Sequence, residues 1–376
     1  MDRKTLTFGE SNVAALAAFF GALGGTLILS AVALLIDIPT GGSFSSSDGY
    51  LLLTMVSTQF LMFAGAFFYL SVFRRVNYFK LFSFGFDKLD ARKTGLLLLI
   101  TVGCILLFVP FAELFVWALT LTGYKPIGGD ISFGEGFGGI LTVVFAAAVL
   151  PAVFEEALFR GVYLNGARKR GSFFAVVYSA FIFMIYHGNP VQTVHQFFLG
   201  IVLAYLAVVS GKIGYGIAVH FLNNFIAVLL SFVPFQELSA GWTAFMYVVW
   251  VLAGAIILIP SLKAFSRMSE KERNPAEERA RAENGGFFAT VVFDITSTFS
   301  KIFKLITKKG EIKKGIEAFN SRYDGINEFN GEIPDDVVFA FGKNEGKKLP
   351  VSAVLLIIGF AAMWLAALVM GFFNIY

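Results

Sequence analysis

Long apolar runs, each about as long as a bilayer crossing requires, alternate along the chain with short polar segments. An α-helix rises 1.5 Å per residue, so about 20 apolar residues cross the hydrocarbon core. On this basis we expect membrane-spanning helices near residues 13–36, 50–73, 95–122, 137–165, 173–187, 191–210, 213–233, 242–262 and 351–374. The fifth run is short, and only three residues separate it from the sixth. The pattern therefore predicts an all-α polytopic bundle of eight to nine transmembrane helices.

Charge divides the chain into four parts. We expect an N-terminal transmembrane hairpin with a basic loop (1–94), a transmembrane core (95–262), a charged cytoplasmic segment (263–349) and a last span (350–376). Within the charged segment, apolar residues recur at helical spacing from Phe287 to Ile306. This spacing predicts an amphipathic helix that lies either on the cytoplasmic leaflet or against the protein, and periodicity leaves both alternatives open.

Basic residues are concentrated in alternate loops. They follow the second, fourth and sixth expected spans, whereas the loops at 39–49, 123–137 and 234–241 contain Lys125 as their single basic residue. Loops rich in Lys and Arg stay on the cytoplasmic side. We therefore expect an integral, multi-pass protein of a prokaryotic plasma membrane with its N-terminus in the cytoplasm.

The composition supports the membrane assignment. Of the 376 residues 57% are hydrophobic and 15% are charged, against roughly 25% charged in an average soluble domain. The single cysteine, Cys104, lies in an apolar run, which excludes a disulfide framework and a cysteine-based metal site. We expect membrane lipids, and not nucleic acid, among the partners.

Ionisable residues inside the expected spans point to a functional site. A charged side chain at the bilayer centre costs at least about 2.5–3.5 kcal/mol on insertion scales. The fourth span nevertheless contains the adjacent carboxylates Glu155 and Glu156, followed by Arg160. Glu156 and Arg160 lie four residues apart on one helix face and can form a structural ion pair. Glu155 points about 100° away and is available for proton chemistry.

Two histidines and an asparagine of the following spans lie at compatible depths. His187 closes the fifth span, and His220 in the seventh is followed at i+4 by Asn224 on the same face. Counted from the cytoplasmic ends of their helices, Glu155 lies about 15 Å deep, His220 about 10 Å and His187 about 21 Å. With helix tilt and a kink at Pro151, we expect Glu155, His187, His220 and Asn224 to form one cluster.

Two other polar residues receive no catalytic role. His195, early in the sixth span, is best interpreted as a hydrogen-bonded packing residue. Glu113 in the third span is another intramembrane carboxylate, to which we assign no role.

Three short motifs occur in order on these apolar helices: Glu-Glu-x-x-x-Arg at 155–160, Phe-x-x-x-His at 183–187 and His-x-x-x-Asn at 220–224. Together they resemble the motifs of the CPBP family, the CAAX protease and bacteriocin-processing or abortive-infection family of intramembrane proteases, which includes the type II CAAX prenyl endopeptidases. The resemblance covers about residues 95–262 and excludes 263–349 and the last span.

The resemblance implies a role for each polar residue. Glu155 and His187 would activate a water molecule, and His220 and Asn224 would stabilise the oxyanion of the tetrahedral intermediate. A carboxylate can act as a general base and a histidine or asparagine N–H as an oxyanion donor, so the residue types suit this chemistry.

Zinc is the competing assignment, with Glu155, His187 and His220 as three protein ligands. A His-Glu-x-x-His motif is absent from the sequence, and His220 shares a helix face with Asn224 as a pair of donors would. We therefore favour hydrolysis without a metal cofactor.

We expect an intramembrane endopeptidase acting on a peptide or lipidated protein substrate. Prenylated CAAX-type proteins are one substrate class, and peptide maturation or bacteriocin immunity is another role. A non-catalytic immunity or scaffold protein is the alternative from a different class. A transporter is less favoured because the sequence shows no paired inverted halves.

Overall fold

The computed structural model describes residues 6–76, 91–126, 136–232, 239–273, 317–318, 320–321 and 349–373. These residues include eight helices that are long and apolar enough to cross a membrane, together with the shorter apolar helix Ser172–Tyr186. The prediction of an all-α polytopic bundle is therefore confirmed. The amphipathic helix expected at 287–306 lies outside the described residues, as does most of the segment 263–349.

The helices follow the expected spans closely. In chain order they are α1 (Phe8–Thr40), α2 (Asp48–Phe68) with a π-helical continuation (Tyr69–Phe73), α3 (Ala91–Thr120), α4 (Gly136–Val144), a π-helical stretch (Phe145–Val149), α5 (Leu150–Glu156), a second π-helical stretch (Ala157–Leu164), α6 (Asn165–Ala167), a 3-10 turn (Arg168–Arg170), α7 (Ser172–Tyr186), a 3-10 turn (Pro190–Gln192), α8 (Thr193–Ser210), α9 (Gly214–Ser231), α10 (Ala240–Arg273) and α14 (Val351–Phe373). The largest difference is α10, which continues to Arg273 beyond the expected end at residue 262.

Local sequence signals explain where α1 begins and ends. The Thr7 side chain accepts a hydrogen bond from the Glu10 backbone N–H, and the Glu10 carboxylate accepts one from the Thr7 N–H at 2.9 Å. This capping box satisfies two N–H groups that the first helical turn leaves without partners. The helix stops at Gly41, whose φ of 67° lies in the left-handed region that glycine adopts readily.

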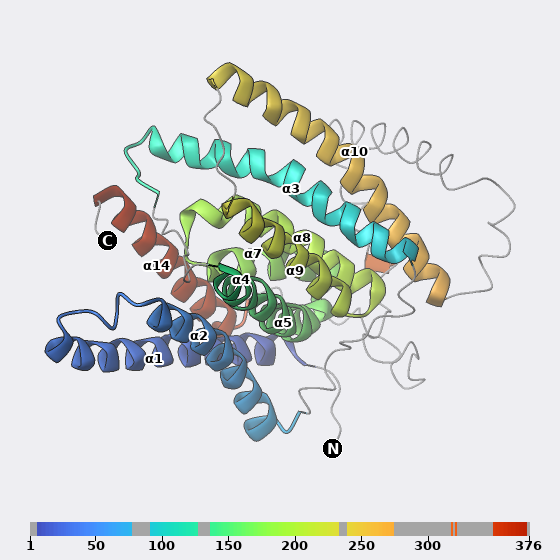
Figure 1. Cartoon of the computed structure of the whole chain (residues 1–376). Coiled ribbons are helices and arrows are strands. Elements are labelled where there is room, and N and C mark those ends of the chain that lie inside the picture. The colour runs from blue at the N-terminus through green and yellow to red at the C-terminus, as the bar shows by residue number, and fades with distance from the viewer. Residues whose placement is uncertain are drawn as a thin grey trace, which may run out of the picture.

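Three groups of helices make up the bundle (Figure 1). The hairpin α1–α2 lies on one side, the pair α3–α10 lies on the other, and α5, α7, α8 and α9 lie between them. Glycines allow the paired helices to approach closely. A Cβ on Gly65 of α2 would lie 2.3 Å from the carbonyl oxygen of Ala17 in α1, and one on Gly254 of α10 would lie 2.5 Å from the backbone nitrogen of Leu107 in α3. Small residues are used in this way at helix interfaces within membranes.

The last span packs on the bundle from outside the central group. Phe360 of α14 makes edge-to-face contacts with Phe19 of α1 and Tyr186 of α7, with ring centroids 5.0 and 5.4 Å apart. Trp364 Nε1 donates to Thr193 Oγ1 of α8 at 2.8 Å. The helix that follows the charged segment is therefore an integral part of the fold.

Helix ends that flank the basic loops meet one another. The residue after the π-helical continuation of α2 and the first residue of α6 both contact the start of α1, and the starts of α3 and α9 contact each other. The contacts are Arg74 with Glu10, Leu6 N with Asn165 Oδ1, and Lys93 Nζ with Tyr215 Oη. This agrees with basic loops gathered on one side, and their cytoplasmic placement remains a prediction from charge.

Candidate active site

The fourth span changes its helical winding on both sides of the adjacent glutamates. The π-helical stretches Phe145–Val149 and Ala157–Leu164 flank α5, which ends at Glu156. Short π-helical insertions occur frequently at functional sites. Pro151, at the start of α5, has no N–H to donate to the carbonyl of Ala147 four residues earlier. Asn224 Nδ2 of α9 donates to that carbonyl at 3.2 Å. The carbonyl of Ala147 is thus an attachment point for Asn224, and the kink at Pro151 remains a prediction.

Glu156 is the centre of a buried polar network. Arg160 Nη1 donates to Glu156 Oε1 at 2.6 Å, and both side chains are fully buried. Arg160 Nη2 also donates to the carbonyl of Gly200 in α8 at 3.0 Å. His220 Nδ1 lies 3.2 Å from Glu156 Oε1, and because a carboxylate oxygen only accepts, the imidazole donates. The predicted ion pair is therefore present, and it also joins the fourth span to α8 and α9.

A glycine leaves room for the second oxygen of Glu156. A Cβ on Gly216 would lie 2.7 Å from Glu156 Oε2, well inside van der Waals contact. The bare backbone of α9 at this position allows the carboxylate to lie between helices.

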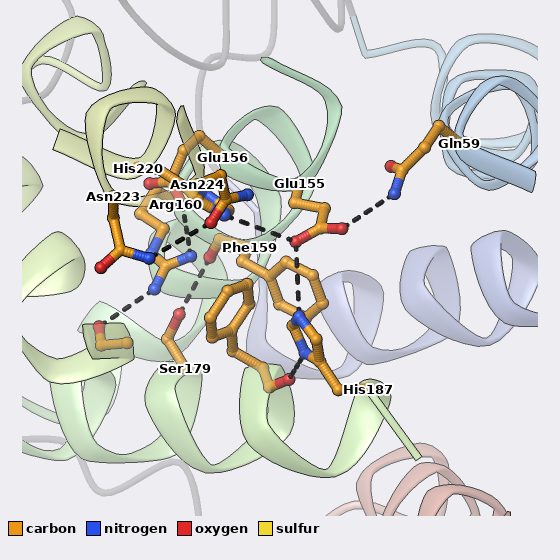
Figure 2. A network of polar contacts seen from close by, with 12 residues as sticks. Gln59, Glu155, Glu156, Phe159, Arg160, Ser179, His187, His220, Asn223 and Asn224 are labelled. Carbon is orange, nitrogen blue, oxygen red and sulfur yellow. Dashed lines mark hydrogen bonds and ion pairs between the residues drawn. The ribbon is translucent and has the colours of Figure 1, made fainter. Parts of the chain in front are cut away.

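Glu155 has a different environment from its neighbour. Its side chain is buried, and Oε1 accepts a hydrogen bond from Gln59 Nε2 of α2 at 2.9 Å. Oε2 lies 3.9 Å from His187 Nε2 and 4.0 Å from His220 Nε2, and has no hydrogen-bond partner among the described residues (Figure 2). The structure thus brings Glu155, His187 and His220 together, as expected from their depths.

The hydrogen bond of His187 determines its tautomer. His187 follows the last residue of α7, and its Nδ1 lies 2.7 Å from the carbonyl oxygen of Phe183 in the preceding turn. The carbonyl only accepts, so Nδ1 carries the proton, and Nε2 of the neutral ring is an acceptor. That acceptor is the ring atom that lies near Glu155 Oε2.

Asn224 is held from two directions. In addition to its bond with Ala147, its Oδ1 accepts from Asn223 Nδ2 at 3.2 Å. An amide nitrogen has two N–H groups, and the bond to Ala147 uses one of them. Asn223 is buried, and His195 of α8 lies close to it. His195 therefore borders the cluster, and its packing role remains a prediction.

Two residues of this neighbourhood were not identified from the sequence. Asn223 and Gln59 are neutral amides within apolar helices, a pattern that is as typical of helix–helix contacts as of a site. Neither side chain is ionisable, so the insertion cost that singles out intramembrane carboxylates does not mark them. Glu113, by contrast, is exposed on α3 and belongs to a different part of the bundle.

Glu155 lies farther from each of the two other alternative zinc ligands, His187 and His220, than a zinc ion requires. With ligand distances of about 2.1 Å, the donor atoms of a tetrahedral site lie about 3.4 Å apart. The separations of Glu155 Oε2 from the two Nε2 atoms are 3.9 and 4.0 Å. No group of three His, Cys, Asp or Glu side chains in the described ranges is arranged to hold a metal ion. As placed, the side chains do not fit tetrahedral zinc, and metal-free chemistry stays a prediction.

A family model described as type II CAAX prenyl endopeptidase Rce1-like matches residues 137–226. The matched residues include Glu155, His187, His220 and Asn224, and they lie within the range 95–262 covered by the sequence resemblance. The match confirms the resemblance to the CPBP family of intramembrane proteases. No curated protein and no solved structure matches the chain.

Proposed function

From this match and the arrangement around Glu155, we propose that the protein is an intramembrane endopeptidase in which Glu155 is the general base. The observation that carries the proposal is that two histidine side chains from other helices lie near the same oxygen, Glu155 Oε2. A buried carboxylate oxygen without a hydrogen-bond partner among the described residues lies 3.9 and 4.0 Å from two imidazole nitrogens on other helices. Most buried carboxylate oxygens are hydrogen-bonded. Glu156 Oε2 also has no partner among the described residues, so what distinguishes Glu155 is the pair of imidazole nitrogens near its Oε2.

The spacing between Glu155 and His187 suits a bound water molecule. Both Glu155 Oε2 and His187 Nε2 are acceptors, and their separation of 3.9 Å is too long for a direct hydrogen bond. A water oxygen about 2.8 Å from each atom can donate one hydrogen to each. In the proposed reaction this water transfers a proton to Glu155 as its oxygen attacks the carbonyl carbon of the substrate.

His220 and Asn224 are the proposed donors to the oxyanion. His220 already donates from Nδ1 to Glu156, so donation from Nε2 requires a ring that carries both protons. A positive imidazolium also balances the local charge, since Glu155 and Glu156 otherwise outnumber Arg160 by one. The second donor is the N–H of Asn224 that is not used in the bond to Ala147. When the tetrahedral intermediate collapses, the carbon–nitrogen bond breaks and the proton held by Glu155 passes to the leaving amine.

We further propose that the substrates are membrane-associated peptides or lipidated proteins, with CAAX-type prenylated chains as the first class to test. The matched family is one of CAAX prenyl endopeptidases. A base buried among apolar helices is also more accessible to a substrate that partitions into the bilayer than to a soluble protein.

The test is cleavage by the purified full-length protein in lipid nanodiscs. The probes are two fluorescence-quenched peptides of one sequence, in which three residues follow a cysteine. The cysteine is farnesylated in one peptide and unmodified in the other, and products are identified by mass spectrometry. We expect Glu155→Gln to lower the cleavage rate by at least about 100-fold, the range in which a lost general base acts. Glu113→Gln is the matched control, because it removes an intramembrane carboxylate outside the cluster. Equal cleavage by the parent and Glu155→Gln would contradict the proposal, and a phenotype that survives Glu155→Gln would favour a non-catalytic scaffold.

A further inference from the structure

We infer that Gln59 is a positioning residue that determines which oxygen of Glu155 acts as the base, an inference that rests on the proposed function. Gln59 lies on α2, in the N-terminal hairpin and outside the family-matched residues 137–226. Its Nε2 donates to Glu155 Oε1 at 2.9 Å, as Figure 2 shows. Because an ionised carboxylate only accepts, the amide nitrogen and not the amide oxygen must face Glu155.

This single hydrogen bond makes the two oxygens of Glu155 inequivalent. With Oε1 held by Gln59, Oε2 is the oxygen that lies 3.9 Å from His187 Nε2 and 4.0 Å from His220 Nε2. The terminal torsion of a glutamate side chain is broad and roughly two-fold, so the carboxylate has little rotational preference of its own. Without the donor, the plane of the carboxylate is free to turn away from the histidines. The attacking water would then lose one of its two fixed acceptors.

A purely structural role explains Gln59 poorly. Its Oε1 is buried and has no hydrogen-bond partner in the described part of the chain. An unpaired buried amide oxygen is unfavourable, and an apolar side chain would avoid this penalty. The docking of α2 on the fourth span is provided by neighbouring aromatics instead. Phe60 and Phe63 contact Phe154 edge-to-face, with ring centroids 6.1 and 5.3 Å apart.

The experiment compares three variants of the full-length protein in nanodiscs on the farnesylated quenched peptide. Gln59→Leu removes the donor at similar volume. Gln59→Asn keeps the amide but shortens it by one methylene, so that it no longer reaches Glu155. Thr58→Val is the matched control in the same helical turn, since Thr58 Oγ1 donates to the carbonyl of Thr54 and lies 3.4 Å from Thr26 Oγ1 of α1, both away from Glu155.

We expect both Gln59 variants to lower kcat about 10-fold with KM changed less than two-fold, because a hydrogen bond to a charged group is lost while substrate contacts remain. Thr58→Val should match the parent. The infrared absorption of the Glu155 carboxylate is a second measurement. The band is assigned to Glu155 because it is absent from the spectrum of Glu155→Gln. We expect this band to shift in Gln59→Leu and to keep its position in Thr58→Val.

Three results would overturn the inference. They are a kcat equal to that of the parent in either Gln59 variant, a fall in kcat/KM that comes from a higher KM, and an unshifted Glu155 band in Gln59→Leu. If Glu155→Gln abolishes cleavage while both Gln59 variants turn over normally, the inference fails and the proposed function stands. If Glu155→Gln still cleaves, the proposed function fails and this inference fails with it.

Discussion

Glu155 Oε2 and His187 Nε2 lie 3.9 Å apart on different helices, and each is a hydrogen-bond acceptor. Two acceptors at this distance do not bond to each other, but one water molecule can donate to both. The contact that fixes the His187 tautomer, Nδ1 to the carbonyl of Phe183, belongs to its own helix. The imidazole orientation is therefore set locally, while its distance to Glu155 is set by the packing of α7 against the fourth span.

This relationship predicts the outcome of removing the imidazole. We expect His187→Ala to lower kcat by about 10²–10⁴-fold, the usual contribution of a positioned proton acceptor. The thermal unfolding midpoint should change little, because the lost bond lies within one helical turn. The matched control is His195→Gln, a neighbouring histidine interpreted as a packing residue, and it should retain activity within a few-fold. Equal losses in both variants would contradict the separation of roles.

The buried pair of Glu156 and Arg160 predicts a stability effect. Arg160→Met leaves Glu156 buried without its main counter-charge, and breaking such a pair costs about 3–5 kcal/mol. We expect a clear fall in the thermal unfolding midpoint, measured by tryptophan fluorescence in detergent. The double variant Glu156→Gln with Arg160→Met should be more stable than Arg160→Met alone, since no unpaired charge remains. A double variant that is less stable than Arg160→Met would show that the pair is not the source of the loss.

Pro151 predicts opposite effects on stability and activity. In Pro151→Ala the new backbone N–H can donate to the carbonyl of Ala147 and compete with Asn224 Nδ2 for that oxygen. An alanine inside a helix is also about 3 kcal/mol more favourable than a proline. We therefore expect an equal or higher unfolding midpoint together with a several-fold lower kcat. Pro110→Ala in α3 is the control, because Pro110 lies inside a helix away from the cluster. Unchanged kcat in Pro151→Ala would contradict the link to Asn224.

The spacing of Glu155, His187 and His220 predicts insensitivity to chelators. Because the donor atoms lie farther apart than tetrahedral zinc places its ligands, we expect EDTA or 1,10-phenanthroline to leave the cleavage rate within two-fold of the untreated protein. Metal analysis of the purified protein by mass spectrometry should show less than one zinc per ten chains. Inhibition that is reversed by added zinc would favour the metal assignment.

Much of the fold could be predicted because its determinants are local. The length of each apolar run sets the minimum extent of a helix, since backbone groups in a bilayer must be satisfied within the same segment. The pairing of Glu156 with Arg160 follows from a spacing of four residues on one helix. The boundary at Arg273 was missed because charged residues after residue 262 continue the same helix beyond the apolar run, so the end of hydrophobicity is not the end of the helix.

The sequence by itself determined the helical type of the membrane spans, their number to within one helix, and the order of the three motifs. The depths of Glu155, His187, His220 and Asn224 in the bilayer remain predictions. The tertiary structure alone decided that Gln59 reaches Glu155, that His220 donates to Glu156, and that the carbonyl of Ala147 accepts from Asn224. Helical periodicity specifies which side chains share one face of one helix. It does not specify the rotation, tilt and separation of neighbouring helices, and those packing variables determine which side chains from different helices touch.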